Sequence, residues 1–217
     1  SYQDEKLYKL HGITEYMRIR EYIKSAPSIK AFTVVVLAGF SCSGKSTTAK
    51  KLVDRYGFDL MEQYIIYHDI SSSKGYKRTR YWLADIGNEN FVSEITVETV
   101  RRIQNLSRSK GVVIDASYGH RMHAILNSTL PNAQVIIIVV TTSKEERVQR
   151  MKGRMGSSIE EAETELAFRD KFLSDVGLQD IMDKAEFKVE NKGSIEAVIS
   201  EIDQILDKYR IRSLEHR

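Results

Sequence analysis

The most constraining feature of the sequence is residues 33–52, where an apolar run enters a glycine-bounded loop and continues as a helical pattern. Gly39, Gly44, Lys45 and Ser46 match the P-loop spacing G-x-x-x-x-G-K-[ST], in the strand–loop–helix context that this motif requires. The glycines let the backbone curl so that successive N–H groups and the positive end of the helix point at one phosphate. The stretch therefore predicts a site for the phosphate chain of a nucleotide.

The same motif assigns roles to individual side chains. We expect Lys45 to reach the β- and γ-phosphates as a catalytic cation, and the Ser46 hydroxyl to ligate Mg²⁺. The predicted cofactors are thus ATP and Mg²⁺. The expected nucleotide contacts come from the loop and the helix start, with one arginine from later in the chain: Gly39, Ser41, Cys42, Ser43, Gly44, Lys45, Ser46, Thr47 and Arg150.

Composition bounds the remaining possibilities. A chain of 217 residues with 41% hydrophobic residues can build one substantial core, and a net charge of +3 is too small to argue for nucleic-acid binding by itself. One cysteine excludes an internal disulfide and fits a reducing compartment. The longest apolar run, residues 135–140, is only strand-sized, so we expect no membrane span and a cytoplasmic location.

The order of apolar runs and helical patterns predicts a doubly wound α/β fold with a five-stranded parallel sheet. The expected P-loop kinase domain covers residues 33–212. Residues 1–32 are expected to form an N-terminal helical extension, which either packs on the domain or makes an oligomer contact.

Two carboxylates are expected where strands end. Residues 63–69 are predicted to form a short strand that delivers Asp69, and Asp115 follows the apolar run 110–114 in the manner of a Walker B strand. Ligands bind beyond the carboxyl ends of strands in such sheets. We therefore expect Asp69 to contact Mg²⁺ or accept the acceptor's proton, and Asp115 to hold the water shell of the metal. The alternative for each is a cap or turn residue.

Arginines mark a candidate lid at about residues 147–170. Arg147, Arg150 and Arg154 share one helical face before a glycine-bearing turn, and Arg169 lies on the helix that returns. Closure of such a lid would expel water and set Arg154 and Arg169, as catalytic residues, against the transferring phosphoryl group. The alternative is a surface hairpin in which these arginines pair with glutamates.

A basic and aromatic segment, residues 71–82, is the candidate acceptor region, because basic groups bind phosphate and aromatic rings stack on bases. It could hold a small nucleotide or a polynucleotide strand; alternatively, it is a solvated loop with Trp82 turned inward. Arg121, or the histidines at positions 120 and 123, could also face the acceptor.

These residues together resemble the nucleoside monophosphate kinase superfamily, most closely its dephospho-CoA kinase and cytidylate kinase-like branch, which includes archaeal dephospho-CoA kinase-related proteins. The resemblance runs from Thr33 to Tyr209. It is carried by the P-loop, Asp69, the strand ending in Asp115, the arginine lid, and a tail from Arg169-Asp170 to Gly193-Ser-Ile-Glu. It implies a core sheet, an acceptor region after the second strand, a mobile lid and Mg-ATP as donor.

The chain departs from this family at one position. Relatives commonly carry an arginine three residues after the acid of the second strand, where this chain has Ser72. We expect Lys74, Arg78 or Arg80 to bind the acceptor phosphate in its place.

The resulting hypothesis is an ATP-dependent phosphotransferase that moves the γ-phosphoryl of Mg-ATP to a small nucleotide or nucleotide-like acceptor. One alternative is a polynucleotide 5′-hydroxyl kinase, for which nucleic acid would be the partner. Another is a nucleotide-dependent switch or scaffold. Switching of the GTPase type is disfavoured, because residues 191–194 lack the aspartate that reads guanine.

Overall fold

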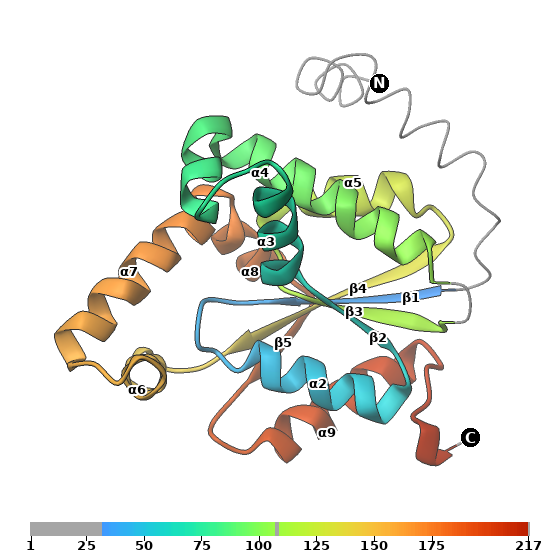
Figure 1. Cartoon of the computed structure of the whole chain (residues 1–217). Helices are drawn as coiled ribbons and strands as arrows, with labels where there is room; N and C mark the ends of the chain where they lie inside the picture. Colours follow the sequence, from blue (N-terminus) through green and yellow to red (C-terminus); the bar gives the residue numbers. More distant parts are fainter. Residues whose placement is uncertain (1–31, 107–108, 217) are drawn as a thin grey trace.

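The computed structural model describes residues 32–106 and 109–216 and is built around one sheet in which all strands are parallel (Figure 1). The strands run in the spatial order β2-β3-β1-β4-β5, so the P-loop strand lies at the centre. This confirms the predicted doubly wound, five-stranded α/β fold. The strands are β1 (Phe32–Ala38), β2 (Asp59–Glu62), β3 (Gly111–Asp115), β4 (Ala133–Thr141) and β5 (Phe187–Glu190).

Helices cover both faces of the sheet (Figure 1). One face carries α3 (Gln63–Ser73), α4 (Thr79–Gln104), α5 (Gly119–Thr129) and α8 (Leu178–Lys184); the other carries α2 (Lys45–Tyr56) and α9 (Ile195–Lys208). A hairpin of α6 (Lys144–Met155) and α7 (Ile159–Asp175) lies beyond the carboxyl ends of the strands, and a 3₁₀ turn (Leu214–His216) follows α9. Among the described residues, no helix is both long and apolar enough to cross a membrane.

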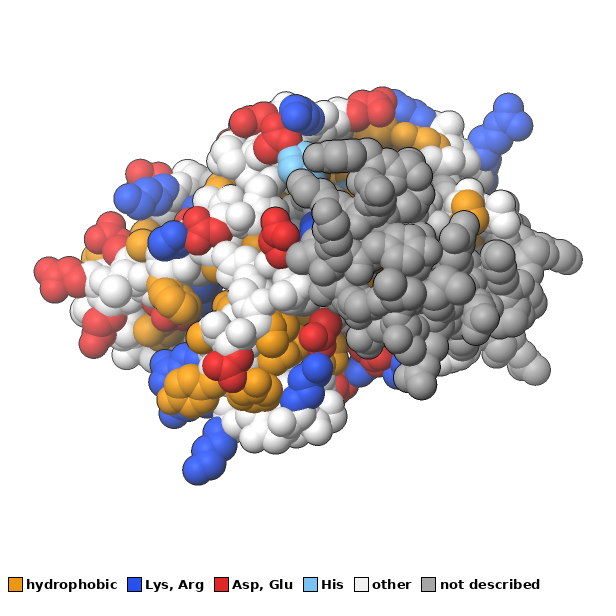
Figure 2. Space-filling model, turned by 90° about the horizontal axis from the view of Figure 1, so that it is seen from above, with side chains coloured by type: hydrophobic (Ala, Val, Ile, Leu, Met, Phe, Trp, Pro, Cys, Tyr) orange, Lys and Arg blue, Asp and Glu red, His pale blue; other side chains and the backbone are white. Residues whose placement is uncertain are grey.

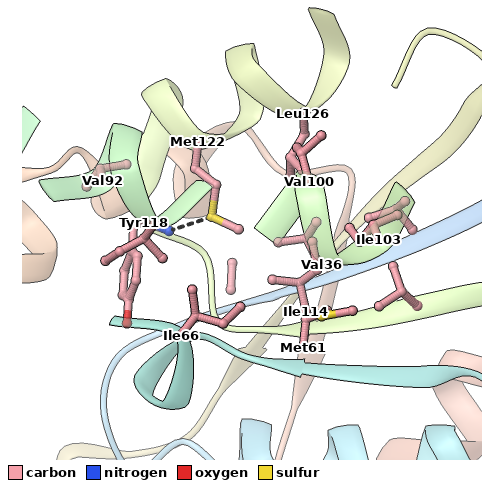
Figure 3. Close-up of a cluster of buried hydrophobic side chains, with 14 of the residues drawn as sticks. Val36, Met61, Ile66, Val92, Val100, Ile103, Ile114, Tyr118, Met122 and Leu126 are labelled. Carbon is pink, nitrogen blue, oxygen red and sulfur yellow. Dashed lines mark hydrogen bonds between the residues drawn. The ribbon is translucent and has the colours of Figure 1, made fainter. Parts of the chain in front are cut away.

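The continuous apolar sequence of β1 explains why it is central. Successive side chains of a strand point to opposite faces, so a strand that is buried on both faces has no polar side to spare. Val34 and Val36 pack into the core under α4 and α5, a part of which Figure 3 shows. Val35 and Leu37 pack on the other side, against the core that α2 and α9 complete. Each fully buried side chain of this size contributes about 1.5–3 kcal/mol.

Serine caps and a glycine mark the ends of the hairpin helices. Ser143 caps α6 by accepting from the Glu146 N–H, and Ser158 forms a reciprocal capping box with Glu161 at the start of α7. The turn between them contains Gly156, which caps the end of α6.

One predicted element is wrong. Residues 63–69 form most of helix α3, whereas the strand is the preceding segment Asp59–Glu62. Helix α4 begins at Thr79 and has a break at Gly87. The candidate acceptor segment 71–82 therefore spans the end of α3 and the start of α4. Residues 1–31 lie outside the described residues, and with them the predicted N-terminal helix and its oligomer contact.

Candidate functional site

The P-loop leaves β1 at the middle of the sheet, and its two motif glycines are required by close approaches. A side chain at Gly39 would collide with the Val140 carbonyl oxygen on β4, and one at Gly44 would collide with the Asn191 side-chain amide. Gly44 also has φ of 105°, a conformation that favours glycine. The tight curl expected of a phosphate cradle is therefore present.

Asn191 ties this loop to the far edge of the sheet. Its side-chain amide donates to the Ser43 carbonyl oxygen (3.0 Å), and its own N–H donates to Thr141 O at the end of β4 (2.7 Å). The cradle is thus supported by residues that lie 148 positions apart in the chain.

Lys45 lies inside the loop. Its Nζ donates to Phe40 O at 2.8 Å and to Ser43 Oγ at 3.4 Å, and only 8% of the residue is exposed. Burial lowers the pKa of Lys45 to about 8, an effect that the negative charge of Asp115 partly offsets. A buried cation held by neutral groups is well suited to receive a phosphate.

The start of α2 leaves further groups available for an anion. No side chain caps this helix, and the first amides of a helix have no intrahelical acceptor. Ser46 and Thr47 expose their side chains in the same turn. The P-loop residues therefore fit a nucleotide phosphate chain, and the Ser46 hydroxyl fits as a magnesium ligand.

Two carboxylates meet at the carboxyl edge of the sheet. The strand register pairs Asp115 of β3 with Leu37 of β1 on one side and with Glu62 of β2 on the other. Both acids are half-buried. Asp115 thus lies at the strand end where the sequence placed it, beside the strand that carries the P-loop.

Glu62 was missed, although it occupies the position expected for Asp69. Sequence reasoning placed the second strand too late, and the available signal was the short acidic segment after Gly57, whose last residue is Glu62. Asp69 instead lies in α3, where its side chain is 55% exposed and pairs with Arg102 at 2.7 Å. The prediction that Asp69 ends a strand was therefore wrong, while its catalytic and metal-binding roles stay predictions.

The base of the α6–α7 hairpin is docked on the P-loop. Arg147 donates through Nε to Ser41 O (2.8 Å), pairs with Asp170 (2.7 Å) and lies over the Phe40 ring, 5.2 Å from its centroid. Only 12% of the Arg147 side chain is exposed. A cavity of about 470 Å³ opens between the two helices, with this ion pair in its lining.

A small apolar cluster strengthens this docking. Arg150 donates to Cys42 O at 3.2 Å and pairs with Glu146 at 3.1 Å. Cys42 itself packs with side chains of both hairpin helices, namely Val148, Met151, Ala162 and Leu166. Arg147 and Arg150 therefore hold the loop backbone in this structure.

The other two hairpin arginines lie apart from the loop contacts. Arg154 is exposed near the hairpin tip. The Arg169 side chain is 43% exposed and donates to Glu165 at 2.6 Å. The structure therefore divides the four arginines of the predicted lid into two that bind P-loop carbonyls and two that are exposed.

Aromatic rings connect the helices on the expected acceptor side. Phe91 of α4 contacts Tyr67 of α3 and Phe172 of α7, with ring centroids 5.8 and 5.7 Å apart, and Phe172 contacts Tyr118 at 5.8 Å. Trp82 is fully buried against Phe91. The inward-facing alternative for Trp82 was thus the right one.

The basic residues in this region divide into paired and incompletely paired groups. Lys74 pairs with Glu94 at 2.9 Å. Arg121 bonds Ser93 through Nε and lies 3.7 Å from Glu89, but its buried Nη2 has no partner among the described residues. Burial lowers the pKa of Arg121. Arg121 therefore keeps hydrogen-bonding capacity that an anionic ligand could use.

The two histidines of α5 have protein partners. His120 pairs with Asp180, and His123 bonds Ser117 at 2.8 Å. Within residues 32–106 and 109–216, no cluster of three or more His, Cys, Asp or Glu side chains could hold a metal ion. Magnesium would thus depend on the Ser46 hydroxyl, single carboxylates, water and the nucleotide, as expected for this ion.

Comparisons with known proteins agree with this geometry. A family model described as an AAA domain matches residues 35–169. A UPF0200 protein of Thermococcus kodakarensis is 25% identical over 182 residues, which cover 81% of this chain and 97% of that protein. A cytidylate kinase of Ignicoccus hospitalis is 32% identical over 141 residues, covering 64% of this chain and 74% of that protein.

A solved structure, that of TT1252 from Thermus thermophilus, has a similar fold. The TM-score is 0.58 at 18% sequence identity, and the match covers 82% of this chain and 98% of that one. The resemblance to P-loop nucleotide kinases that the sequence motifs predicted is confirmed.

Proposed function

Because the chain belongs to the AAA domain family, we propose that it is an ATP-dependent phosphotransferase acting on a nucleotide or nucleotide-like acceptor. It is a kinase-like P-loop protein related to nucleotide kinases. The observation that supports transfer chemistry best is the arrangement at the sheet edge. A buried Lys45 lies in the phosphate cradle, with Asp115 and Glu62 at the ends of the next two strands.

Bound Mg-ATP would supply the γ-phosphoryl group. The loop amides and Lys45 would orient and neutralise the phosphate chain, with Ser46 and Asp115 on the magnesium side. Glu62, at the neighbouring strand end, would accept the proton of the attacking acceptor group. Charge-assisted contacts of this kind contribute most when they strengthen in the transition state.

Arg121 supports an anionic acceptor. Its Nη2 is a buried donor without a partner among the described residues, and burying such a group costs roughly 1–3 kcal/mol until a partner is supplied. A phosphate on the acceptor would supply that partner. Arg154 and Arg169 remain candidates for contact with the transferring phosphoryl group.

The surface offers less support for a polynucleotide substrate. On the face shown in Figure 2, acidic and basic side chains are interspersed over the part drawn in colour, and no single basic stripe crosses it. A strand of nucleic acid is usually held by a continuous basic groove. The similarity to a cytidylate kinase of Ignicoccus hospitalis also favours a small nucleotide acceptor.

An acceptor screen tests the proposal. ADP release from Mg-ATP would be measured with nucleoside monophosphates, dephospho-CoA and 5′-hydroxyl oligonucleotides. We expect turnover with a small acceptor, and Lys45→Ala should lower it by about 10²- to 10³-fold, as for loss of a preorganised charge-stabilising donor. Lys50→Ala is the matched control, because Lys50 is exposed on the same helix.

Three outcomes would contradict the proposal. Turnover with oligonucleotides alone would favour the polynucleotide kinase, and ATP hydrolysis that no acceptor stimulates would favour a switch. Unchanged turnover in a folded Lys45→Ala protein would remove the assigned site.

A further inference from the structure

The segment that carries Asp115 is held by a buried hydrogen-bond network centred on Ser117. Ser117 is 1% exposed, and its N–H donates to Leu37 O of β1 at 2.9 Å. This bond extends the pairing of β1 and β3 beyond the last residue of β3. The backbone two residues after Asp115 is thereby fixed to the strand that leads into the P-loop.

The Ser117 side chain makes a second connection, to α5. Its Oγ lies 2.8 Å from His123 Nε2 and accepts from the Gly119 N–H at 3.4 Å. The neighbouring Tyr118 N–H points to the Met122 sulfur at 3.3 Å, the dashed line in Figure 3. The segment between β3 and α5 is thus joined to β1 on one side and to the first two turns of α5 on the other.

His123 is unusual because it is buried without full satisfaction. It is 6% exposed, and its Nδ1 has no partner among the described residues. Burial lowers the pKa of His123 to about 4, so the imidazole is neutral near pH 7. A buried polar ring with one unsatisfied nitrogen lowers the stability of the fold, whereas an apolar side chain of similar size would not. This cost suggests that the hydrogen bond to Ser117 has a function.

A serine beside a histidine also suggests nucleophilic chemistry, but burial argues against it here. Ser117 Oγ lies inside the protein, and an attacking hydroxyl must reach its substrate. The contacts instead hold the backbone two residues after Asp115, from where they can influence the position of its carboxylate.

We propose that His123 is a positioning residue which, through Ser117, fixes the segment that places Asp115 beside the P-loop. The inference rests on the proposed function, because it assigns to that segment the coupling of magnesium to nucleotide binding. It predicts that the Nε2 position of His123 matters, while the charge of the ring does not.

The test compares His123→Gln with His123→Phe. Glutamine can return an amide nitrogen near the Nε2 position, whereas phenylalanine fills the space without a hydrogen bond. His120→Phe, on an exposed histidine of the same helix, is the matched control. Hydrogen–deuterium exchange of the Ser117 amide reports the segment directly, and calorimetric titration of ATP with and without Mg²⁺ reports the coupling.

We expect His123→Phe to speed exchange at Ser117 and to reduce the Mg²⁺-dependent gain in ATP affinity by about tenfold, the lower end of the range for outer-shell changes. ATP affinity without Mg²⁺ should change less than twofold. His123→Gln should recover most of both effects. Ser117→Ala should match His123→Phe, and the double variant should be no worse, because both remove one shared interaction.

A purely structural role would give a different result. His123→Phe would then lower the melting temperature, while the folded protein would keep wild-type exchange at Ser117 and wild-type magnesium coupling; that result overturns the inference. A wild-type chain whose ATP affinity is indifferent to Mg²⁺ would overturn it as well. Failure of the proposed function looks different, since Mg²⁺-coupled ATP binding would persist while no acceptor is phosphorylated.

Discussion

The P-loop lysine and the basic side chains of the α3–α4 region have different kinds of partner. Around the P-loop, Lys45, Arg147 and Arg150 donate to the carbonyl oxygens of the loop, although Arg147 and Arg150 also pair with carboxylates of the hairpin. In the α3–α4 region two basic groups pair with carboxylates, Arg102 with Asp69 and Lys74 with Glu94. Lys45, which has only neutral hydrogen-bond partners among the described residues, keeps its positive charge for a phosphate, whereas pairing cancels the charge of Arg102 and Lys74.

This difference shows which basic side chains can stabilise a bound anion. A cation that is hydrogen-bonded to neutral carbonyl oxygens is not neutralised by an opposite charge. Because it is also partly desolvated, its electrostatic attraction for an incoming anion is strong. A surface ion pair contributes only about 0–1 kcal/mol to stability. Because its charges already neutralise each other, it attracts a further anion only weakly. The following predictions test whether this contrast is correct.

The largest expected effect concerns the pH dependence of stability that Lys45 causes. Its pKa is about 8 in the folded protein and 10.5 ordinarily, so between these values the unfolded chain binds more protons. The free energy of unfolding therefore gains a contribution that rises with pH across this window and is constant below pH 8. A Lys45→Met variant lacks it, so its stability relative to wild type should fall by roughly 3 kcal/mol from pH 8 to 10.5.

Urea unfolding at pH 7, 8, 9 and 10 without nucleotide would measure this difference. Lys50→Met on the exposed face of α2 is the control and should run parallel to wild type. A Lys45→Met curve that also runs parallel would show that Lys45 carries no desolvation cost, and the contrast between the two regions would fail.

The next effect separates the two acids that compete for one role. Glu62→Gln should lower kcat by about 10²-fold, the scale of losing a positioned general base. Asp69→Asn should leave kcat within about twofold, because it breaks only an exposed ion pair. Steady-state kinetics with the identified acceptor would decide, and the reverse ranking would restore Asp69 to the site.

The smallest effect separates the docked arginines from the exposed ones. Arg147→Ala should reduce the free energy of unfolding by about 1–3 kcal/mol, because it leaves Asp170 and the Ser41 carbonyl without their partner. Arg154→Ala should leave stability within about 0.5 kcal/mol, as for exposed sites, and instead lower kcat. Denaturant unfolding combined with steady-state kinetics would test both variants. Equal destabilisation by the two substitutions would contradict the distinction between docked and exposed arginines.

Much of the fold could be predicted because its signals are local. The P-loop match fixed β1, the loop and α2, and serine caps marked where α6 and α7 begin. Asp115 could be placed because an unbroken apolar run of suitable length precedes it. In each case the residues that determine the secondary structure are close together in the sequence.

The second strand was misassigned because short sequence segments fit more than one secondary structure. Residues 64–67 are four consecutive bulky residues that suit a short strand, yet they lie in a helix, and β2 is a four-residue segment with an acid at each end. Periodicity alone does not separate a short apolar strand from a helix turn. The misplacement by a few residues moved the predicted carboxylate from Glu62 to Asp69.

The roles of the hairpin arginines depended on contacts that no local pattern reports. Arg147 and Arg150 share a helical face with Arg154, but only the tertiary structure shows that the first two meet the carbonyls of residues 41 and 42. The unfilled capacity of Arg121 is likewise a property of packing.

The bond from Asn191 to the Ser43 carbonyl has a consequence for biosynthesis. The loop is encoded near the start of the described chain, but its support arrives with the last strand. During synthesis, the N-terminal part of the sheet can collapse while the loop still lacks this support, since domains gain their long-range contacts only when the distant segment has emerged. A nascent chain would therefore acquire its full nucleotide affinity only after the final strand has joined the sheet, so nucleotide binding would appear late in folding.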